Sequence, residues 1–400
     1  GMDSEGQPTE PQWICSPLTV AARTRDPSGL GWGYLLEWED PDKGKHTWIM
    51  PAKLLTASGE EYRAELQDGG LAIAPGTSAR NLLTVYIQTS APDARVTCVD
   101  KTGWHGDVFV LADRTLGASK AKVVFQSARA IRPVRERGTL KEWQDHVGAL
   151  CQGNSRLLFV CSVGFAAPLL ELAEEENGGF HLVGPSSIGK SIAQWVACSL
   201  FGGPDFKRSW RATDNGLEGV ASEFNDLLLA LDELSQVHPK IAGEVAYMLA
   251  HGTGKHRADR TGGARQALTW RLLFLSSGEI GLADHMAEAG KRAHAGQEVR
   301  LLEVPADTGK YGVFEDLHGY PNGADFGSAL KQVTGEYYGT PIPAFIEALL
   351  SRQEETQRVA RELKQDFLER HLPKDAGGQV HRAAGRFALC VVAGELATRY

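Results

Sequence analysis

Residues 180–202 read FHLVGPSSIGKSIAQWVACSLFG. An apolar run ends at Val183, a glycine-rich loop follows, and the residues after the loop repeat apolar side chains at helical spacing. The loop matches the pattern G-x-x-x-x-G-K-[ST] with Gly184, Pro185, Ser186, Ser187, Ile188, Gly189, Lys190 and Ser191. Because strand, loop and helix come in the order that this pattern requires, the stretch predicts a phosphate-binding loop at the start of an α/β core.

The residue types in this loop suit a nucleoside triphosphate. Glycines let the backbone curl until several N–H groups point at one phosphate, and the amino end of the helix adds a positive dipole. We expect Lys190 to reach the β and γ phosphates and the Ser191 hydroxyl to bind Mg²⁺. The loop therefore predicts a nucleotide and a magnesium ion as ligands.

A second apolar run, 227–231, ends in two acids, Asp232 and Glu233. We expect Asp232 to hold the magnesium ion through water and Glu233 to polarise the attacking water, which favours hydrolysis over nucleotide storage. The alternative is that Asp232 only caps a helix. The pair predicts the second half of a nucleotide hydrolysis site.

A third apolar run, 272–275, ends in Ser276 and Ser277. Small polar residues at this place sense the γ-phosphate in ring ATPases, and we choose Ser277 ahead of Ser276 for that role. Two arginines follow, Arg292 and Arg300. Arg300 is the better candidate for entering the neighbouring subunit's site to stabilise transition-state charge, and an ion pair within its own subunit is the alternative.

A basic stretch, 250–265, lies between the second and third runs and reads AHGTGKHRADRTGGAR. The chain as a whole has a formal charge of −8, so this local reversal of sign is informative. Glycines at both ends predict a hinged hairpin that can approach a nucleic-acid backbone closely. The candidate contacts are Lys255, His256, Arg257 and Arg260. The alternative is an ordinary solvated loop.

Length and composition limit the class of protein. The chain has 400 residues, of which 42% are hydrophobic and 23% charged, so we expect a folded protein of two or three domains. Lys and Arg total 42 against 50 Asp and Glu, which excludes a generally basic surface for nucleic acid or for a membrane. The six cysteines form no CxxC pair and no apolar run reaches membrane-spanning length, so we expect a cytoplasmic protein with no membrane partner.

The chain is expected to fall into four regions. These are a mostly β N-terminal domain over 11–135, a helical connector over 136–177, the P-loop ATPase core over 178–310 and a helical C-terminal region over 311–400. Short apolar runs at 32–38, 46–50, 82–87, 107–112 and 122–126 predict the strands of the first region. Its tryptophans, Trp13, Trp32, Trp38, Trp48 and Trp104, are expected to fill the core rather than to stack on a base or sugar.

The segment 129–141 is rich in arginine and predicts a solvated linker. A nucleic-acid footprint of the β domain is the alternative for this segment.

The succession of these motifs resembles the family called domain of unknown function 927, which occurs in helicase and primase-helicase proteins of phages, plasmids and integrated elements. The segments that carry the resemblance are GNSRLLF, FHLVGPSSIGKS, TDNGLEGVASEFNDLLLALDE, GTGKHRADR, LSSGE and GQEVRLLEVPAD, with GWGYLLEW and GWHGDVFVL near the start. The resemblance thus covers nearly the whole chain. The motif order is also similar to that of superfamily 3 helicases, a branch of the AAA+ ring ATPases.

This resemblance implies an AAA+-like P-loop NTPase core, a parallel sheet with flanking helices, that uses ATP. It implies that Lys255 and Arg257 touch DNA, that Arg300 acts in trans, and that identical subunits assemble into a ring, with six as the expected number. Ser277 departs from the Asn that is usual in the superfamily, which weakens the sensor assignment. Relatives continue helically past Tyr400, so we expect a truncation there.

The predicted function is that of an ATP-dependent DNA helicase or translocase module of a mobile genetic element, which hydrolyses ATP at the subunit interfaces of a ring. No priming motif is visible, so a primase or another replication protein is expected as a partner and not as part of the chain. The alternative is a nucleotide-switched AAA+-type assembly or remodelling ATPase that acts on a protein partner.

Overall fold

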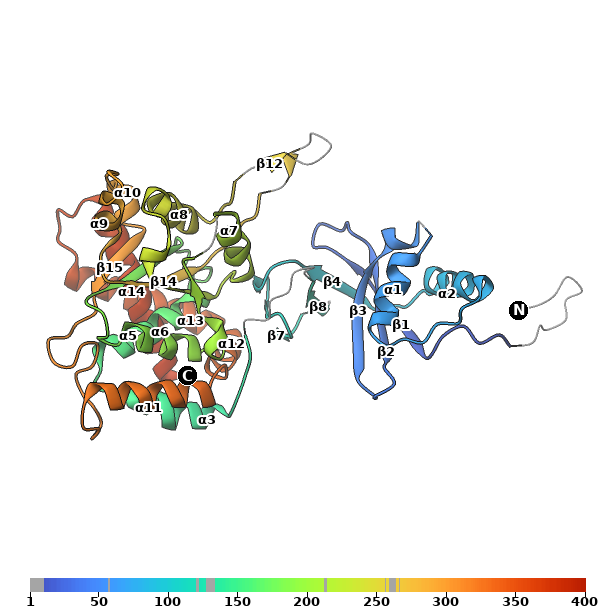
Figure 1. Cartoon of the computed structure of the whole chain (residues 1–400), viewed down its shortest axis with the longest axis horizontal. Coiled ribbons are helices and arrows are strands. Elements are labelled where there is room, and N and C mark those ends of the chain that lie inside the picture. The colour runs from blue at the N-terminus through green and yellow to red at the C-terminus, as the bar shows by residue number, and fades with distance from the viewer. Residues whose placement is uncertain are drawn as a thin grey trace, which may run out of the picture. The chain divides into compact units, whose positions relative to one another are not determined.

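The computed structural model describes residues 11–56, 58–119, 122–126, 134–211, 214–255, 257–258, 264–265 and 267–400 (Figure 1). The chain forms two compact units. The first is Gly1–Asp100 with Ser119–Ala128, and the second is Lys101–Ala118 with Arg129–Tyr400. The backbone therefore passes from one unit to the other three times.

The first unit contains a five-stranded sheet in the order β3-β2-β1-β4-β8. Strands β1, β2 and β3 are antiparallel neighbours, whereas β4 and β8 continue the sheet in parallel with β1. The elements are β1 Leu18–Arg25, β2 Gly33–Glu39, β3 Lys45–Pro51, β4 Arg95–Val99 and β8 Lys122–Phe125, with η1 Ala52–Leu55, α1 Glu60–Asp68 and α2 Thr77–Thr89. The strands predicted at 32–38, 46–50 and 122–126 are confirmed.

The strand predicted at 82–87 is wrong, because these residues lie in α2. Ala79, Leu83 and Ile87 are fully buried at four-residue spacing, which places them on one face of a helix. Leu83 and Ile87 pack in one cluster with Leu36 of β2 and Leu66 of α1. The apolar run looked like a strand because its length suits both structures, and the helical period of its buried positions decides between them.

The tryptophans of the first unit divide into two groups. Trp38 is buried and Trp48 is half-buried. Trp13 and Trp32 are 58% and 41% exposed, so the prediction that they fill the core is wrong. Both precede strands, and therefore lie outside the pleat that sends alternate side chains into the core.

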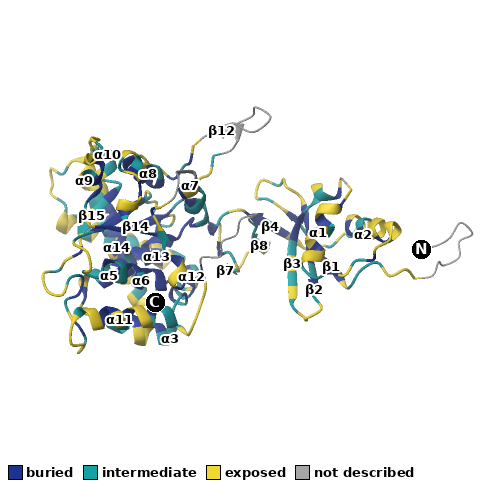
Figure 2. Ribbon diagram, viewed as in Figure 1, coloured by how far each residue is buried: buried dark blue, intermediate teal, exposed yellow. Residues whose placement is uncertain are grey.

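The second unit is built on a five-stranded sheet in the order β10-β11-β14-β9-β15, with all neighbouring strands parallel. Its strands are β9 Gly178–Val183, β10 Arg208–Ser209, β11 Leu228–Asp232, β14 Leu273–Gly278 and β15 Leu301–Pro305. Figure 2 shows buried residues concentrated in the interior of this unit, where β9, β11 and β14 are almost entirely buried. Because the strands are parallel, the loops that follow them meet at one edge.

Helices surround this sheet. They are α3 Leu140–Trp143, the π-helical turn η2 Gln144–Gly148, α4 Ala149–Cys151, α5 Ser155–Ala166, η3 Ala167–Leu169, α6 Lys190–Ser199, η4 Pro204–Phe206, α7 Asp214–Glu223, η5 Leu234–Gln236, α8 Pro239–His251, α9 Leu282–Ala287 and α10 Ala295–Glu298. The C-terminal helices are α11 Gly323–Glu336, α12 Pro341–Ser351, α13 Gln353–His371 and α14 Gly378–Arg399, which confirms the predicted helical C-terminus. No helix among the described residues is long and apolar enough to cross a bilayer.

A small antiparallel sheet belongs to the second unit although its residues fall within the predicted N-terminal region. It consists of β5 Gly103–His105, β6 Val108–Val110 and β7 Thr115–Leu116. Trp104 and Phe109 lie in the hydrophobic core of the second unit, and the backbone N–H of Trp104 donates to Oδ2 of the fully buried Asp226 at 3.0 Å. Arg271 also donates to Asp226, through Nη2 at 2.9 Å. These contacts make the observed division differ from the predicted boundary at residue 135.

Candidate functional site

The glycine-rich loop curls back on itself between β9 and α6. Lys190 begins α6 and is only 8% exposed. Its ammonium donates hydrogen bonds to the carbonyl oxygens of Gly184 at 2.7 Å and Pro185 at 2.6 Å. The lysine thus spans the concave side of the loop, and burial lowers its pKa while the charges of Glu233, and then of Glu279 and Asp232, oppose that shift.

Two glycines allow this loop to close against a distant segment. Gly189 has a φ of +98°, and a Cβ there would lie 2.7 Å from Val313 Cγ2. Gly312 has a φ of +69°, and a Cβ there would lie 2.3 Å from the carbonyl oxygen of Ile188. The Val313 N–H donates to that same oxygen at 2.9 Å. No local pattern in the sequence marks this support, because residues 312–313 belong to no recognised motif.

Asp232 and Ser277 are brought together at the carboxyl edge of the sheet. Asp232 ends β11, and the Ser277 hydroxyl of neighbouring β14 donates to its Oδ1 at 2.9 Å. The next residue, Glu233, has a φ of +58°, and its N–H donates to the Ser277 hydroxyl at 3.4 Å. The three residues chosen from two separate runs therefore form one cluster.

Ser276, the second choice for the sensor, has a different environment. It is fully buried, accepts a hydrogen bond from Trp210 Nε1 at 2.9 Å, and shares another with His181 Nδ1 at 2.8 Å. Burial lowers the pKa of His181 to about 4, so the ring is neutral at pH 7. Ser276 thus belongs to a buried polar network, whereas Ser277 contacts the acids.

Two residues beside Asp232 were missed by the sequence analysis. The Lys207 ammonium lies 2.5 Å from Asp232 Oδ2 and 5.0 Å from the centre of the Trp195 ring. Gln194 of α6 is fully buried and donates through Nε2 to the carbonyl oxygen of Leu231 at 3.0 Å. No local pattern marks Lys207, because its contact depends on β10 lying next to β11 in the sheet.

The donor set around Asp232 suits a magnesium ion bound together with phosphates. Hydroxyl and carboxylate oxygens are the ligands that Mg²⁺ prefers. Ser191 lies in the first turn of α6, and Gln194 in the next turn reaches the carbonyl oxygen of Leu231 at the end of β11. Because residues three apart share a helix face, we expect the Ser191 hydroxyl to face the same end of β11. Within the described residues there is no cluster of three His, Cys, Asp or Glu side chains that could hold a metal. Lys207 would have to leave Oδ2 before that oxygen could bind the ion directly.

The basic stretch forms the predicted hairpin. Strands β12 Arg257–Ala258 and β13 Ala264–Arg265 pair antiparallel, and Figure 1 shows β12 projecting from the second unit. The base is closed by the N–H of Gly254, which donates to the Leu268 carbonyl at 2.8 Å, and Lys255 is exposed. His256 and Arg260 lie outside the described residues.

Arg300 lies at the edge of the sheet opposite the loop. It directly precedes β15, whose Leu301 pairs with Gly179 near the start of β9. Its guanidinium lies 4.3 Å from the centre of the Tyr247 ring and donates to the Gly296 carbonyl at 2.6 Å. Among the described residues no carboxylate forms an ion pair with it. Arg292, the second candidate, is exposed.

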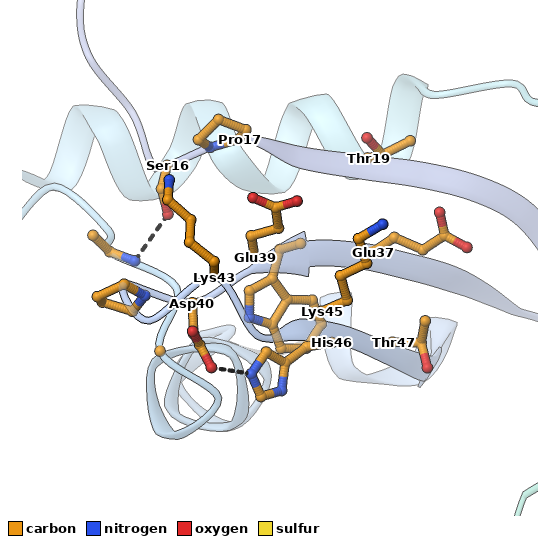
Figure 3. Close-up of a pocket in the computed structure, with 14 residues that line it drawn as sticks. Ser16, Pro17, Thr19, Glu37, Glu39, Asp40, Lys43, Lys45, His46 and Thr47 are labelled. Atoms are coloured by element: carbon orange, nitrogen blue, oxygen red, sulfur yellow. Dashed lines mark hydrogen bonds and ion pairs between the residues drawn. The ribbon is translucent and has the colours of Figure 1, made fainter. Parts of the chain in front are cut away.

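A separate pocket of about 780 Å³ lies in the first unit (Figure 3). The His46 ring stacks on Trp38 with centres 5.4 Å apart, and its Nε2 lies 2.7 Å from Asp40 Oδ2. Acidic Glu37 and Glu39 line the pocket together with basic Lys43 and Lys45. Because these charges are mixed, this pocket lacks the chemistry of a phosphate site.

The structure defines a mixed α/β protein with a parallel sheet and a helical C-terminal region. The chain belongs to the family described as Domain of unknown function (DUF927), whose model matches residues 1–269. In fold it is similar to the solved structure described as "SCCmec type IV Cch - active helicase", with a TM-score of 0.75, 20% identity, and coverage of 96% of this chain and 70% of that chain. A second structure, "The A form apo structure of NrS-1 C terminal region-CTR", matches with a TM-score of 0.36, 8% identity, and coverage of 94% and 87%. No curated protein matches the chain.

Proposed function

We propose that the chain is an AAA+-type P-loop ATPase that serves as a DNA helicase or translocase module of a mobile genetic element. The observation that carries the proposal is the meeting of the Lys190 loop with Asp232, Glu233 and Ser277 at one edge of a parallel sheet. The likeness in fold to a structure described as an active helicase supports the choice of reaction.

In this proposal the loop binds the triphosphate of ATP. The Lys190 ammonium exchanges the two carbonyl oxygens that it now contacts for phosphate oxygens, which is favourable because a buried ammonium gains from a charged partner. Bound Mg²⁺, held by Ser191 and Asp232, supplies charge neutralisation at the phosphates. Glu233 orients and polarises the attacking water, and Ser277 keeps the Asp232 carboxylate in place.

The position of Arg300 favours action between subunits. It lies at the amino edge of the sheet and the loop lies at the carboxyl edge, so an arginine finger from Arg300 would serve the site of a neighbouring copy. A ring of six copies would bring each Arg300 to the next loop. The hairpins carrying Lys255 and Arg257 would then line a channel and bind the phosphates of a DNA strand. A primase or another replication protein would act beside this ring.

The test is steady-state ATP hydrolysis with and without single-stranded DNA, at low salt and over a range of protein concentrations. We expect hydrolysis to rise cooperatively with protein and to be stimulated by DNA. Lys190→Ala should abolish it, while Lys141→Ala, at an exposed lysine of α3, should not. Retention of DNA-stimulated hydrolysis by Lys190→Ala would show that the site assignment is wrong.

A second variant separates the helicase from an ATPase that remodels a protein partner. Lys255→Ala combined with Arg257→Ala should bring the ratio of hydrolysis with DNA to hydrolysis without DNA close to one, because the phosphate contacts are lost. An unchanged ratio would favour the protein-remodelling alternative.

A further inference from the structure

Five side chains gather at one end of the sheet in the first unit. Arg23 and Arg25 come from β1, Tyr34 comes from the start of β2, Trp32 directly precedes β2, and Arg95 begins β4. We call these five residues the arginine–tryptophan patch. Arg23 pairs with Tyr34 on one side and with Arg95 on the other, so the patch runs across three neighbouring strands.

The guanidinium groups of Arg23 and Arg25 lie over the aromatic rings of the patch. The Arg23 guanidinium lies 4.5 Å from the centre of the Tyr34 ring and 5.9 Å from that of Trp32. The Arg25 guanidinium lies 5.8 Å from the centre of Trp32. Tyr34 is buried beneath Arg23, whereas Trp32 remains 41% exposed. The indole therefore lies within cation–π distance of two guanidinium groups and still presents surface to solvent.

The guanidinium groups of the patch contact rings and backbone rather than any carboxylate that the structure describes. In the described part of the chain none of Arg23, Arg25 and Arg95 forms an ion pair, and Arg23 Nε is buried without a hydrogen-bond partner. Arg95 instead donates to backbone, with Nη1 2.7 Å from the Pro92 carbonyl oxygen. The acid next in sequence, Asp26, uses its Oδ1 within its own turn, where it accepts from Ser28 Oγ at 2.6 Å and from the Leu30 N–H at 2.8 Å.

We propose that the arginine–tryptophan patch binds single-stranded nucleic acid. One base stacks on the exposed indole of Trp32, and Arg25 and Arg95 bind the flanking phosphates. Stacking tolerates every base because each has a π face, and guanidinium groups pair well with phosphate. An inorganic anion would use the arginines but not the indole, and an apolar protein surface would leave the arginines without partners. The patch shares no residue with the hairpin, and its binding of nucleic acid requires no residue of the ATP site.

The experiment measures binding of a fluorescently labelled oligo-dT strand to the whole chain by anisotropy, without nucleotide and over a salt series. Trp32→Leu should raise Kd about tenfold, and Trp32→Phe, which keeps a ring, should restore most of the affinity. Arg25→Gln and Arg95→Gln should each reduce the slope of log K against log salt by about 0.7. Arg80→Gln is the matched control, because it removes an exposed arginine of α2 outside the patch.

Several outcomes overturn the proposal. The first is that Trp32→Leu binds the strand with wild-type affinity, and the second is that Arg80→Gln loses as much affinity as the patch variants. The others are that the wild-type chain does not bind the strand at low salt, or that it binds duplex more tightly than single strands. The same measurement with oligo-U in place of oligo-dT shows whether the patch prefers RNA or DNA. A loss of affinity for either strand in Trp32→Leu supports the proposal. Thermal unfolding of each variant separates lost binding from lost folding. If ATP hydrolysis is absent but Trp32→Leu still weakens binding, the proposed function fails and this inference stands. If the chain hydrolyses ATP with stimulation by DNA but Trp32→Leu binds like the wild type, this inference fails and the proposed function stands.

Discussion

Replacing Lys207 by methionine tests the arrangement around Asp232 directly. The Lys207 ammonium lies 2.5 Å from Asp232 Oδ2, with 14% of the lysine side chain and 28% of the aspartate side chain exposed. Methionine keeps much of the length of the side chain and its packing on Trp195 but removes the charge. The variant therefore isolates the ion pair.

The strength of the Lys207–Asp232 ion pair can be estimated from how far its two side chains are exposed. A hydrogen bond between charged groups contributes about 1.5–3 kcal/mol, and partial exposure places this one near the lower end. Binding of a metal ion at Oδ2, either directly or through a water molecule, must displace Lys207 and so gives up about 1.5 kcal/mol, or about tenfold in an equilibrium constant. In the proposed function the phosphates lie near Lys207, so loss of its positive charge should also weaken nucleotide binding, with or without metal. The informative quantity is thus the ratio of the two affinities.

The assay is calorimetric titration with a non-hydrolysable ATP analogue, with Mg²⁺ and with the ion chelated. We expect Lys207→Met to raise the ratio of Kd without Mg²⁺ to Kd with Mg²⁺ about tenfold. In an Asp232→Asn background the same change should have no effect on that ratio, because the carboxylate through which it acts is gone. An unchanged ratio in the first case, or the same rise in the second, would refute the role given to this lysine.

Three further predictions concern the support of the site. Gly189→Ala forces an alanine into a backbone conformation with φ of +98° and puts its Cβ 2.7 Å from Val313 Cγ2. We therefore expect the free energy of unfolding to fall by about 2–4 kcal/mol and nucleotide binding to be lost in a titration. Wild-type affinity for the nucleotide would contradict this expectation. Asp226→Asn removes the buried charge that faces Arg271, which keeps Glu171 as a partner, and should lower the free energy of unfolding by about 1.5–3 kcal/mol in urea; a loss below about 0.5 kcal/mol would show that the pair is dispensable. The His181 pKa lies at about 4, below 6.5 for the ordinary side chain, so the unfolded chain takes up the proton first and stability falls as pH drops from 6.5 towards 4. Urea midpoints of the wild type and His181→Gln should therefore converge over that range, and parallel curves would exclude the effect.

The parts of the candidate site that the sequence predicts are those carried by contiguous residues. The loop ending in Lys190, the acids after β11 and the serines after β14 are each encoded within a few positions. Their placement at one edge follows from parallel strands. Lys207 and Val313 could not be found in this way, because each reaches the site through a strand or loop that no local pattern connects with it.

Local sequence patterns also fall short of predicting the fold at two places. The apolar run at 82–87 fits a strand by composition, and only its burial against β2 and α1 shows that it is helical. The run at 107–112 contains β6 as predicted, yet Phe109 packs in the core of the second unit. Local patterns identify the element, whereas the partner that buries it is a long-range property.

The threefold passage of the backbone between the units restricts how such a gene can recombine. A single crossover near Arg129 would separate Trp104 and Phe109 from the core that they fill and would leave the Asp226 carboxylate without the Trp104 N–H. A crossover after Asp100 would remove β8, an edge strand of the first sheet. Neither unit can be exchanged intact by one cut, so the two are expected to be inherited together, as a pair.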